Sequence, residues 1–322
     1  MPLIESSGYR SRGLLKSGHL QTVLPTLLRA VPEVRYQRTR LTLRDKDFVD
    51  LDCSSVTSDR VAVLCHGLEG STDTHYMRGM TRALNRAGWD VVGFNFRGCS
   101  GEPNLQPRFY HSGATDDLAE VVDAVTSRRA LTHLALVGFS LGGNLVLKYL
   151  GEARGDYPPS LAAAVAISVP CDLGECATRL GALQNQVYAR RFLRHLKNKV
   201  RDKARHLPGL IDLTPLPTIH SIEAFDEHYT APLNGFANAR DYWMRCSSRY
   251  FLDRLASPVL LLSAANDPLL TPACYPVDVA RRSDRLTLEI PPHGGHVGFM
   301  QHPTDGRYWH EQRAVDFLAR HS

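Results

Sequence analysis

One short segment, in which a serine stands among glycines, restricts the fold of this chain more than any other feature. Residues 138–143 read Gly-Phe-Ser-Leu-Gly-Gly; they follow the apolar run Leu134–Val137 and lead into the helical stretch Gly142–Gly151. A serine on such a sharp strand-to-helix turn takes a strained backbone that lifts its hydroxyl above the sheet edge. Bulky side chains two positions before or after it would collide with each other or with neighbouring strands, so both positions need glycine. The segment therefore predicts a nucleophile, Ser140, with a structural glycine-rich turn as the alternative.

Short apolar runs alternate with helical stretches along most of the 322 residues. The runs typical of strands are Val61–Cys65, Asp90–Phe94, Leu134–Val137, Ala163–Ile167, Val259–Ser263 and Leu286–Ile290. The expected helices are Tyr76–Ala87, Ala114–Thr126, Gly142–Gly151 and Trp309–Arg320. Before them, Arg40–Leu43 and Phe48–Cys53 alternate in hydropathy around a charged turn, which predicts an antiparallel hairpin. The order implies an α/β fold with a mostly parallel central sheet and helices on both faces.

The order of the predicted strands and helices divides the chain into three parts. Residues 1–39 form a polar N-terminal arm, and residues 40–170 together with 249–322 form the α/β core. Residues 171–248 contain amphipathic helical stretches and proline-rich loops but no convincing strand. A sheet interrupted by an insertion of roughly 80 residues indicates one catalytic domain with a helical lid, not two tandem domains.

Composition sets the class of protein and its expected location. Hydrophobic residues make up 43% and charged residues 22%, which is typical of a soluble globular chain and excludes a disordered one. No signal peptide and no apolar stretch long enough to span a membrane is visible, so a cytoplasmic protein is expected. The seven cysteines are scattered without a CxxC pair, which favours free thiols over disulfides or a zinc site. We expect neither a metal nor a cofactor.

A serine needs a base to become a nucleophile, and the base needs an acid that orients it. In this architecture the two follow the serine along the chain, first the acid and then a histidine. Asp267 lies just after one apolar strand and His296 just after the last, so both are expected at the edge that carries Ser140. A turn-forming role is the alternative for Asp267, and His293 is the rival of His296.

The negative charge that develops on the substrate oxygen needs two backbone N–H donors. One is expected from Leu141, the residue after the nucleophile, at the N-terminus of its helix. The second is expected from Leu68 in the glycine-containing loop 66–70, which follows the first parallel strand. His66 in this loop is interpreted as a hydrogen-bonding brace, and the alternatives are a metal ligand or a second base.

Six groups of residues, taken together and in order, resemble the bacterial YheT-like branch of the α/β-hydrolases. They are residues 18–22, 66–71 with Tyr76, 95–104, 110–113, 138–144 and 293–299. The resemblance implies a serine hydrolase that acts on carboxylic esters, with the triad Ser140, Asp267 and His296. Animal and yeast relatives act on acylglycerols, phospholipids or medium-chain esters, and many animal forms begin with a membrane anchor that is not expected here.

The same family shows an HxxxxD pattern that is sometimes linked to acyl transfer, and here it runs from His111 to Asp116. Judged from the residues themselves, Ser112 to Asp116 look like the capped start of the helix Ala114–Thr126, with acidic residues in its first turn. We interpret the pattern as structural, because a triad is already complete elsewhere.

The insertion carries a concentration of positive charge. The chain has a net charge of +5, and between Arg190 and Arg205 stand eight basic residues and one acidic residue, so the rest is slightly acidic. Nucleic acid is therefore not an expected partner. Apolar residues recur among the cations, at Tyr188, Phe192, Leu196, Val200, Ala204 and Leu207. The pattern predicts an amphipathic helix, or a pair of them, with either a solvated basic face or a surface for peripheral contact with anionic lipid.

Aromatic residues gather near the end of the insertion and are candidates for a substrate pocket. They fall in the segment Phe225–Thr230 and at Phe236, Tyr242 and Trp243. Either they line an acyl pocket or they form the core of the lid, and the sequence favours neither.

The leading hypothesis is a carboxylesterase that cleaves small-molecule esters with short to medium acyl chains through an acyl-enzyme. Acyl transfer to an alcohol is one alternative, because it uses the same triad and the same intermediate. The other is a hydrolase-fold protein that binds a ligand in the pocket with little turnover.

Overall fold

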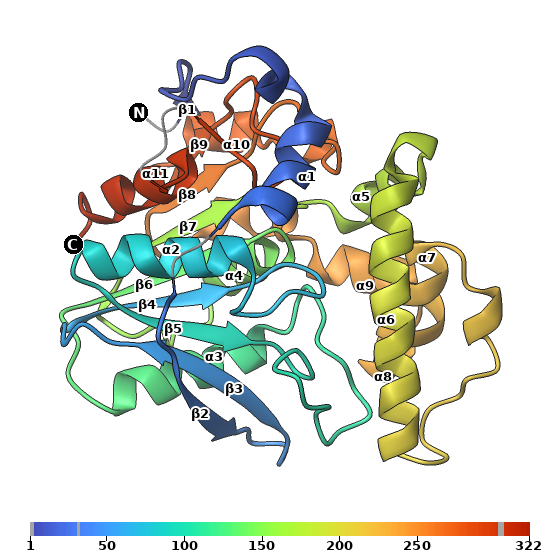
Figure 1. The fold of residues 1–322 in the computed structure, drawn as a ribbon. Coiled ribbons are helices and arrows are strands. Elements are labelled where there is room, and N and C mark those ends of the chain that lie inside the picture. The colour runs from blue at the N-terminus through green and yellow to red at the C-terminus, as the bar shows by residue number, and fades with distance from the viewer. Residues whose placement is uncertain (1–2, 31–32, 302–305) are drawn as a thin grey trace.

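Residues 3–30, 33–301 and 306–322 are described by the computed structural model, and within them nine strands form one sheet (Figure 1). Along the sheet the order is β1 (Leu3–Ile4), β9 (Leu286–Glu289), β8 (Val259–Leu262), β7 (Leu161–Ile167), β6 (His133–Phe139), β4 (Arg60–Cys65), β5 (Asp90–Asn95), β3 (Phe48–Ser54) and β2 (Gln37–Thr42). β3 runs antiparallel to β2 and to β5, and all other neighbouring strands are parallel. The mostly parallel α/β sheet predicted from the sequence is confirmed, as is the hairpin at its edge.

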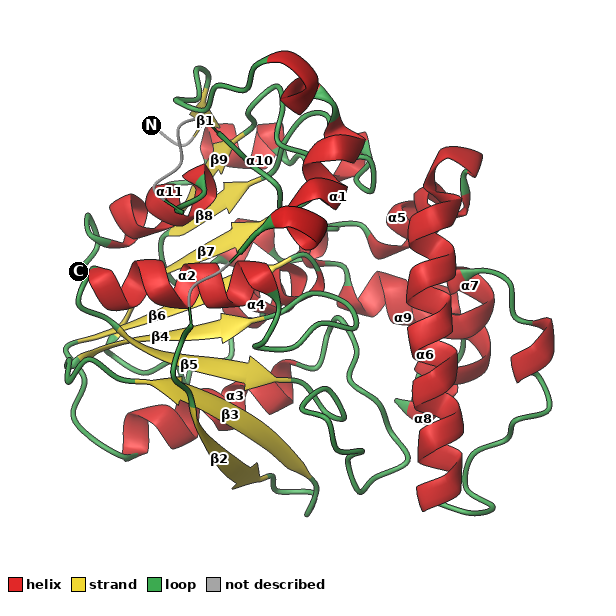
Figure 2. Cartoon of the chain, in the orientation of Figure 1, coloured by secondary structure: helices red, strands yellow, loops and turns green. Residues whose placement is uncertain are grey.

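Helices cover both faces of this sheet, as Figure 2 shows. In chain order they are α1 (Gly18–Leu28), α2 (His75–Arg86), α3 (Thr115–Ser127), α4 (Leu141–Gly151), α5 (Leu173–Gly181), α6 (Gln186–His206), α7 (Ile222–Phe225), α8 (Ala231–Leu233), α9 (Ala239–Cys246), α10 (Val277–Arg282) and α11 (Trp309–Leu318). Side chains of α3, α4 and α10 belong to the core layer on one face, and those of α2 and α11 to the layer on the other.

The central strands are buried on both sides, and alternate residues along them enter opposite halves of the core. On β4, Val61 and Val63 join the layer of α3 and α4, whereas Ala62 and Leu64 join the layer of α2. β4 and β6 are neighbours in a register that pairs Cys65 with Gly138. Because both strands end at the same edge, the loop after β4 meets the segment that carries Ser140.

The segment predicted as an N-terminal arm contains regular structure. β1 pairs with β9, α1 spans Gly18–Leu28, and β2 begins at Gln37, before the predicted start at Arg40. Helix α1 was not predicted from the sequence; it contains Pro25, a residue that normally argues against a helix. A Cβ on Gly18 would lie 2.0 Å from the carbonyl oxygen of Asn266, so α1 packs directly against the loop that carries Asp267.

Residues 171–248 contain α5 to α9 and short turns, and no strand lies among them. These helices stand together beyond the carboxyl ends of the parallel strands, and α6 is the longest of the group (Figure 1). The predicted amphipathic stretch is one continuous helix, α6. Its buried side consists of Ala189, Leu193, Leu196, Val200 and Lys203. The predicted stripe is therefore confirmed at Leu196 and Val200, while its other members are only half-buried.

Three further properties concern the class of protein. All seven cysteines are free thiols. Within the described ranges, no helix combines the length and the apolar content needed to cross a bilayer. In the same part of the chain, no three side chains of His, Cys, Asp or Glu converge in the way that ligands of a metal ion do.

Candidate active site

The turn between β6 and α4 holds Ser140 in the conformation that the glycine pattern predicts. Ser140 has φ of 52° and ψ of −119°, a backbone conformation that a residue other than glycine adopts only under strain. A Cβ on Gly138 would lie 2.3 Å from the carbonyl oxygen of Gly142, and one on Gly142 would lie 2.3 Å from that of Cys65. Any side chain at either position would overlap backbone atoms. The steric requirement for both glycines is confirmed.

The structure brings Ser140, Asp267 and His296 together from three separate loops. Nε2 of His296 lies 2.9 Å from Oγ of Ser140, and Nδ1 lies 2.8 Å from Oδ2 of Asp267. The Asp267 side chain is fully buried, and its other oxygen accepts a hydrogen bond of 2.9 Å from the Leu269 amide. Asp267 therefore also shapes its own turn, as the alternative interpretation proposed. His293 is turned elsewhere, with Nδ1 lying 3.5 Å from the side-chain nitrogen of Asn266.

The backbone of the histidine loop is anchored by three polar side chains. Thr22 on α1 accepts a hydrogen bond of 2.9 Å from the His296 amide, and Ser168 accepts one of 2.9 Å from the Val297 amide. Asn266 accepts one of 3.1 Å from the Gly295 amide. Sequence reasoning assigned no role to these anchors. The signal that could have found Thr22 was the group at residues 18–22, which was used only for the family resemblance.

The backbone amides of Leu68 and Leu141 are candidates for the two oxyanion donors. In the loop after β4, the Gly67 amide donates to the Tyr76 hydroxyl (3.0 Å), and the Glu69 amide donates to the Tyr110 hydroxyl (2.8 Å). Among the described residues neither Leu68 nor Leu141 has an acceptor for its N–H. Both residues line the same cavity as Ser140 and His296. Two residues with unsatisfied backbone donors therefore line the cavity that contains Ser140.

His66 braces this loop, and the structural interpretation is confirmed. It is fully buried, its Nδ1 donates to the Gly67 carbonyl oxygen at 2.8 Å, and its Nε2 accepts from the Phe96 amide at 3.2 Å. Burial lowers the pKa of His66 to about 3, so the ring is neutral. With both nitrogens engaged, it has no free position for a metal or a proton.

His111 and Asp116 are not brought together. The Asp116 side chain is exposed and pairs with Arg154 at 3.2 Å, while Nδ1 of His111 accepts from the Gly113 amide at 3.2 Å. The expected capping of α3 is wrong in detail, because its N-cap is Ala114 and no side chain caps it. The acidic first turn is present, and its second member, Asp117, is an ion-pair partner of Arg97.

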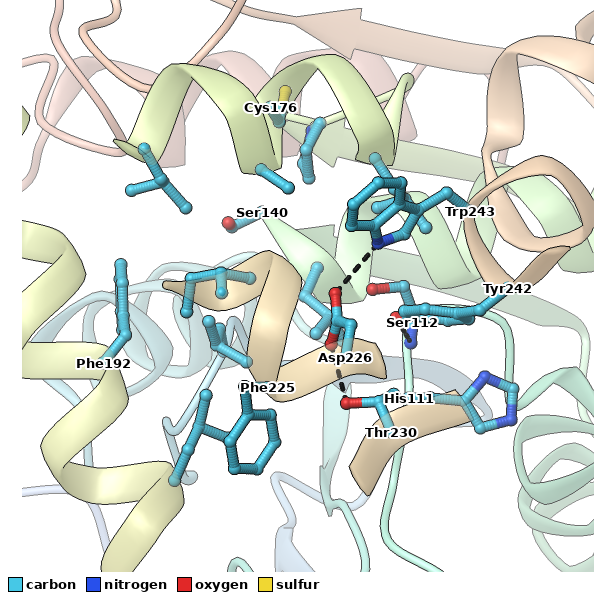
Figure 3. A pocket seen from close by; sticks show the side chains of 18 of the residues that line it. His111, Ser112, Ser140, Cys176, Phe192, Phe225, Asp226, Thr230, Tyr242 and Trp243 are labelled. Carbon is cyan, nitrogen blue, oxygen red and sulfur yellow. Dashed lines mark hydrogen bonds between the residues drawn. The ribbon is translucent and has the colours of Figure 1, made fainter. Parts of the chain in front are cut away.

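A cavity of about 120 Å³, which we call the inner pocket, lies between Ser140 and the insertion. Of the predicted aromatic residues, Phe225, Tyr242 and Trp243 line it (Figure 3). Phe236 instead packs against Tyr242 at 5.3 Å between ring centres, inside the insertion. The aromatic segment is therefore divided: these three residues line a cavity, and Phe236 packs within the insertion.

A second depression, which we call the outer groove, also has Ser140 and His296 in its lining. It has a volume of about 400 Å³ and runs between α1 and α6, where Leu27 and Arg191 lie on its walls. Ser140 and His296 thus line both the inner pocket and the outer groove.

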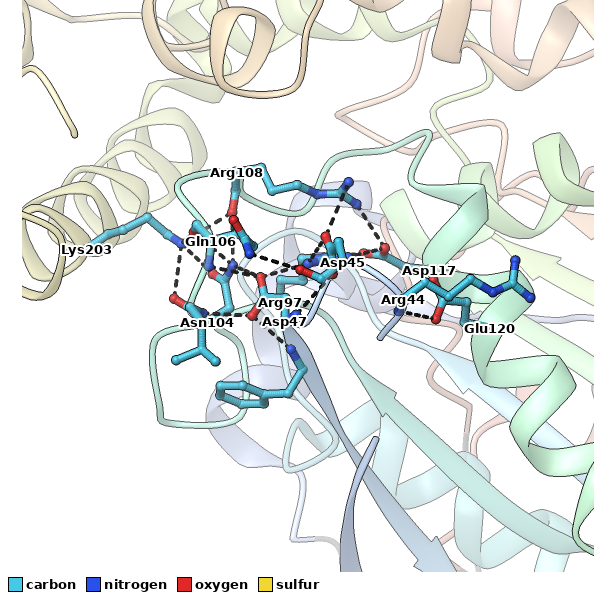
Figure 4. A network of polar contacts seen from close by, with 12 residues as sticks. Arg44, Asp45, Asp47, Arg97, Asn104, Gln106, Arg108, Asp117, Glu120 and Lys203 are labelled. Carbon is cyan, nitrogen blue, oxygen red and sulfur yellow. Dashed lines mark hydrogen bonds and ion pairs between the residues drawn. The ribbon is translucent and has the colours of Figure 1, made fainter. Parts of the chain in front are cut away.

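Two lysines of the basic segment do not belong to a solvated face. Lys203 is buried, and its ammonium group is within 2.6 Å of Oδ1 of Asn104 and also donates to the Gln106 carbonyl (Figure 4). Lys199 pairs with Glu69 at 2.9 Å and lies 4.7 Å from the centre of the Tyr110 ring. The prediction of a uniformly solvated basic face is wrong at these two positions, because both side chains tie α6 to loops of the core.

Comparison with known proteins agrees with this fold. A profile of the alpha/beta hydrolase fold matches residues 61–303. The chain is 36% identical over 310 residues to an Escherichia coli protein named "Putative esterase YheT", covering 93% of this chain and 89% of that protein. It is 28% identical over 294 residues to human "Phospholipase ABHD3", covering 88% and 71%. The structure of the Pyrococcus furiosus esterase Pf2001 superimposes with a TM-score of 0.60 at 15% identity, covering 91% and 96%.

The profile and the sequence identity together establish that the chain belongs to the α/β-hydrolase family. Within that family it is a YheT-like hydrolase of the esterase and lipase type.

Proposed function

We propose that this protein hydrolyses carboxylic esters with short to medium acyl chains through a covalent acyl-enzyme. The observation that carries the proposal is the unbroken path from Ser140 Oγ through both nitrogens of His296 to Asp267, with distances of 2.9 and 2.8 Å. His296 takes the serine proton as Oγ attacks the ester carbonyl, and Asp267 stabilises the imidazolium that forms. The alcohol leaves with that proton, and the serine keeps the acyl group.

The free amides of Leu68 and Leu141 are proposed to stabilise the oxyanion in this step. The negative charge that develops on the substrate carbonyl oxygen would then be stabilised by two N–H groups that are already in place and make no other hydrogen bond to the described residues. Preorganised donors of this kind are usually the largest single contribution to lowering the activation barrier. Water, activated by His296, resolves the acyl-enzyme in the second half of the reaction. Short to medium chains are proposed because the inner pocket, at about 120 Å³, is small and enclosed mainly by apolar side chains.

We further propose that the exposed arginines of α6 make peripheral contact with anionic lipid. Without Lys199 and Lys203, the face still presents five exposed cations, Arg190, Arg191, Arg194, Arg201 and Arg205. Beside them Val187 is 76% exposed and Leu183 is 92% exposed. Arginines beside exposed apolar side chains suit the interface of an anionic bilayer, and Arg191 lines the outer groove that leads to Ser140.

The test of the esterase proposal combines covalent labelling with turnover. A fluorophosphonate probe is expected to label Ser140 in the wild-type protein, because labelling requires an activated serine, and the Ser140→Ala variant is expected to remain unlabelled. The same variant should lose hydrolysis of p-nitrophenyl butanoate and hexanoate by several orders of magnitude. Labelling with negligible turnover in water, but ester formation with added alcohols, would favour acyl transfer. Absence of both labelling and turnover would overturn the proposal.

A further inference from the structure

The inner pocket ends in polar groups that the proposed ester chemistry does not use. Its walls are mostly apolar and include Leu173, Ala177, Leu180, Leu196 and Ile222. At one end, however, stand Ser112, Asp226, Thr230, Tyr242 and Trp243. Figure 3 shows the carboxylate of Asp226 between Trp243 and Thr230, with a hydrogen bond to each.

Asp226 begins a one-turn π-helix, Asp226–Thr230, that follows α7. Such widened turns are rare and occur often at functional sites. Oδ1 of Asp226 accepts from the Thr230 hydroxyl at 2.7 Å, and Oδ2 accepts from the Trp243 indole nitrogen at 2.9 Å. Among the described residues no cation forms an ion pair with it.

A carboxylate in this position is incompletely satisfied. It has about four lone-pair sites, and two neutral donors leave about half of them open. Burial raises the pKa of Asp226 to about 6, which reflects the cost of holding the charge here without a positive partner. The residue as a whole keeps part of its surface accessible and lines the inner pocket, so we expect a ligand in that pocket to reach its open acceptor sites.

We propose that Asp226 is a specificity-determining residue that binds a hydrogen-bond donor, a hydroxyl or an ammonium group, on the arm of the ester that fills the inner pocket. The inference rests on the proposed esterase function and narrows its substrates to esters with a polar group remote from the reacting carbonyl. Apolar walls hold the intervening carbon chain, and the open acceptor sites of the carboxylate receive the donor. An arm that ends in a methyl group would leave these sites unpaired, which a site built to hydrogen bond discriminates against strongly.

The test compares esters that differ only at the remote end. For the acyl arm these are the p-nitrophenyl esters of hexanoate, 6-hydroxyhexanoate and 6-aminohexanoate; for the alcohol arm they are hexyl, 6-hydroxyhexyl and 6-aminohexyl acetate. In one of the two series, kcat/KM of the wild-type protein should favour a donor-bearing ester over its methyl-terminated analogue by roughly tenfold or more. Equal values in both series would overturn the proposal.

Variants of Asp226 then test whether its carboxylate causes the preference for donor-bearing esters. Asp226→Leu should reverse the preference, and Asp226→Asn, which keeps an acceptor oxygen, should lose the preference for the amino ester first. The matched control is Glu223→Gln, which removes an exposed carboxylate from neighbouring α7 and should leave every ratio unchanged. Circular dichroism and thermal unfolding establish that each variant is folded. A preference that survives in both Asp226 variants would also overturn the proposal.

A binding measurement separates this inference from the proposed reaction. Calorimetric titration of the Ser140→Ala protein with 1-hexanol and with 6-amino-1-hexanol needs no turnover, and tighter binding of the amino alcohol, lost on adding Asp226→Leu, supports the role of Asp226. The wild-type protein could hydrolyse methyl-terminated esters and show no preference for esters that carry a donor. That result would leave the esterase proposal intact and would refute only the proposed role of Asp226.

Discussion

The edge of the sheet that carries Ser140 and the helical insertion above it are held in place by different means. At the edge, backbone packs against backbone: a Cβ on Gly138 would lie 2.3 Å from the carbonyl oxygen of Gly142, and one on Gly142 would lie 2.3 Å from that of Cys65. The insertion is tied down mainly by side chains, such as Asn185, which donates to the Pro268 carbonyl at 2.8 Å, and Lys203. The difference indicates that the catalytic geometry tolerates almost no change, while the insertion can vary around it.

We expect the sheet edge that carries Ser140 and the helical insertion to have different roles. The edge supplies the serine, the histidine and the free amides, whose positions must be correct to within fractions of an ångström for acyl transfer. The insertion supplies most of the inner pocket and the exposed arginines of α6. On the proposed function, we therefore expect the reaction type to depend on the core and the choice of substrate to depend on residues 171–248.

The largest effect is expected from the histidine loop, where two histidines are separated by two glycines. His296→Ala should lower kcat for p-nitrophenyl butanoate by about 10⁴-fold, because the base is lost while the fold is kept. His293→Ala, the control in the same loop, should stay within a few-fold of wild type, since its ring does not contact Ser140. Similar losses in both variants would contradict the assignment of the base and indicate a loop that fails as a whole.

The anchoring of the insertion is tested by removing a buried charge and an exposed one from the same helix. Lys203→Met should lower the free energy of unfolding by about 3 kcal/mol, because the acceptors at Asn104 and Gln106 lose a charged donor inside the protein. Arg201→Met, with its side chain on the exposed side of α6, should change it by less than about 0.5 kcal/mol. Urea unfolding measures both, and equal stability of the two variants would show that Lys203 is not an anchor.

A pair of glycine variants compares the two regions directly. Gly142→Ala should cost about 2 kcal/mol or more of unfolding free energy, since its Cβ would overlap the Cys65 carbonyl oxygen. Gly181→Ala, at the end of α5, meets nothing within 4 Å and should be neutral or stabilise by a few tenths of a kcal/mol. Thermal unfolding distinguishes them, and a tolerated alanine at position 142 would contradict the claim that the edge is packed by backbone.

The sequence predicted the parts of this molecule that depend on local pattern. The parallel strands, the turn at Ser140 and the loop positions of Asp267 and His296 each follow from residues close together in the chain. The support that Thr22 gives to His296 could not be predicted in this way, because those residues lie far apart in the sequence and α1 lacks a clear helical pattern. Lys203 was missed for a related reason, since a lysine among other cations is indistinguishable from an exposed one until the loop of Asn104 is placed beside it.

The smallest expected effect concerns the exposed face of α6. Arg194→Gln should weaken binding of the protein to vesicles that contain phosphatidylserine by about 1 kcal/mol, roughly fivefold, because each cation near an anionic surface contributes about that much. Its control is Arg86→Gln, which removes the same charge from the C-terminal end of α2, at the opposite end of the sheet from the insertion. This control should bind as the wild-type protein does.

Turnover of a small ester in solution should be unchanged by either variant, since charges at the surface are screened beyond about 10 Å at ordinary salt. Co-sedimentation at several salt concentrations measures the difference, and the two variants should converge as salt rises. Equal weakening by both would mean that net charge alone matters, and it would remove α6 as the docking face. If the wild-type protein does not bind anionic vesicles at all, the proposed lipid contact is refuted. The inner pocket would then be the only means by which we expect the insertion to select substrates.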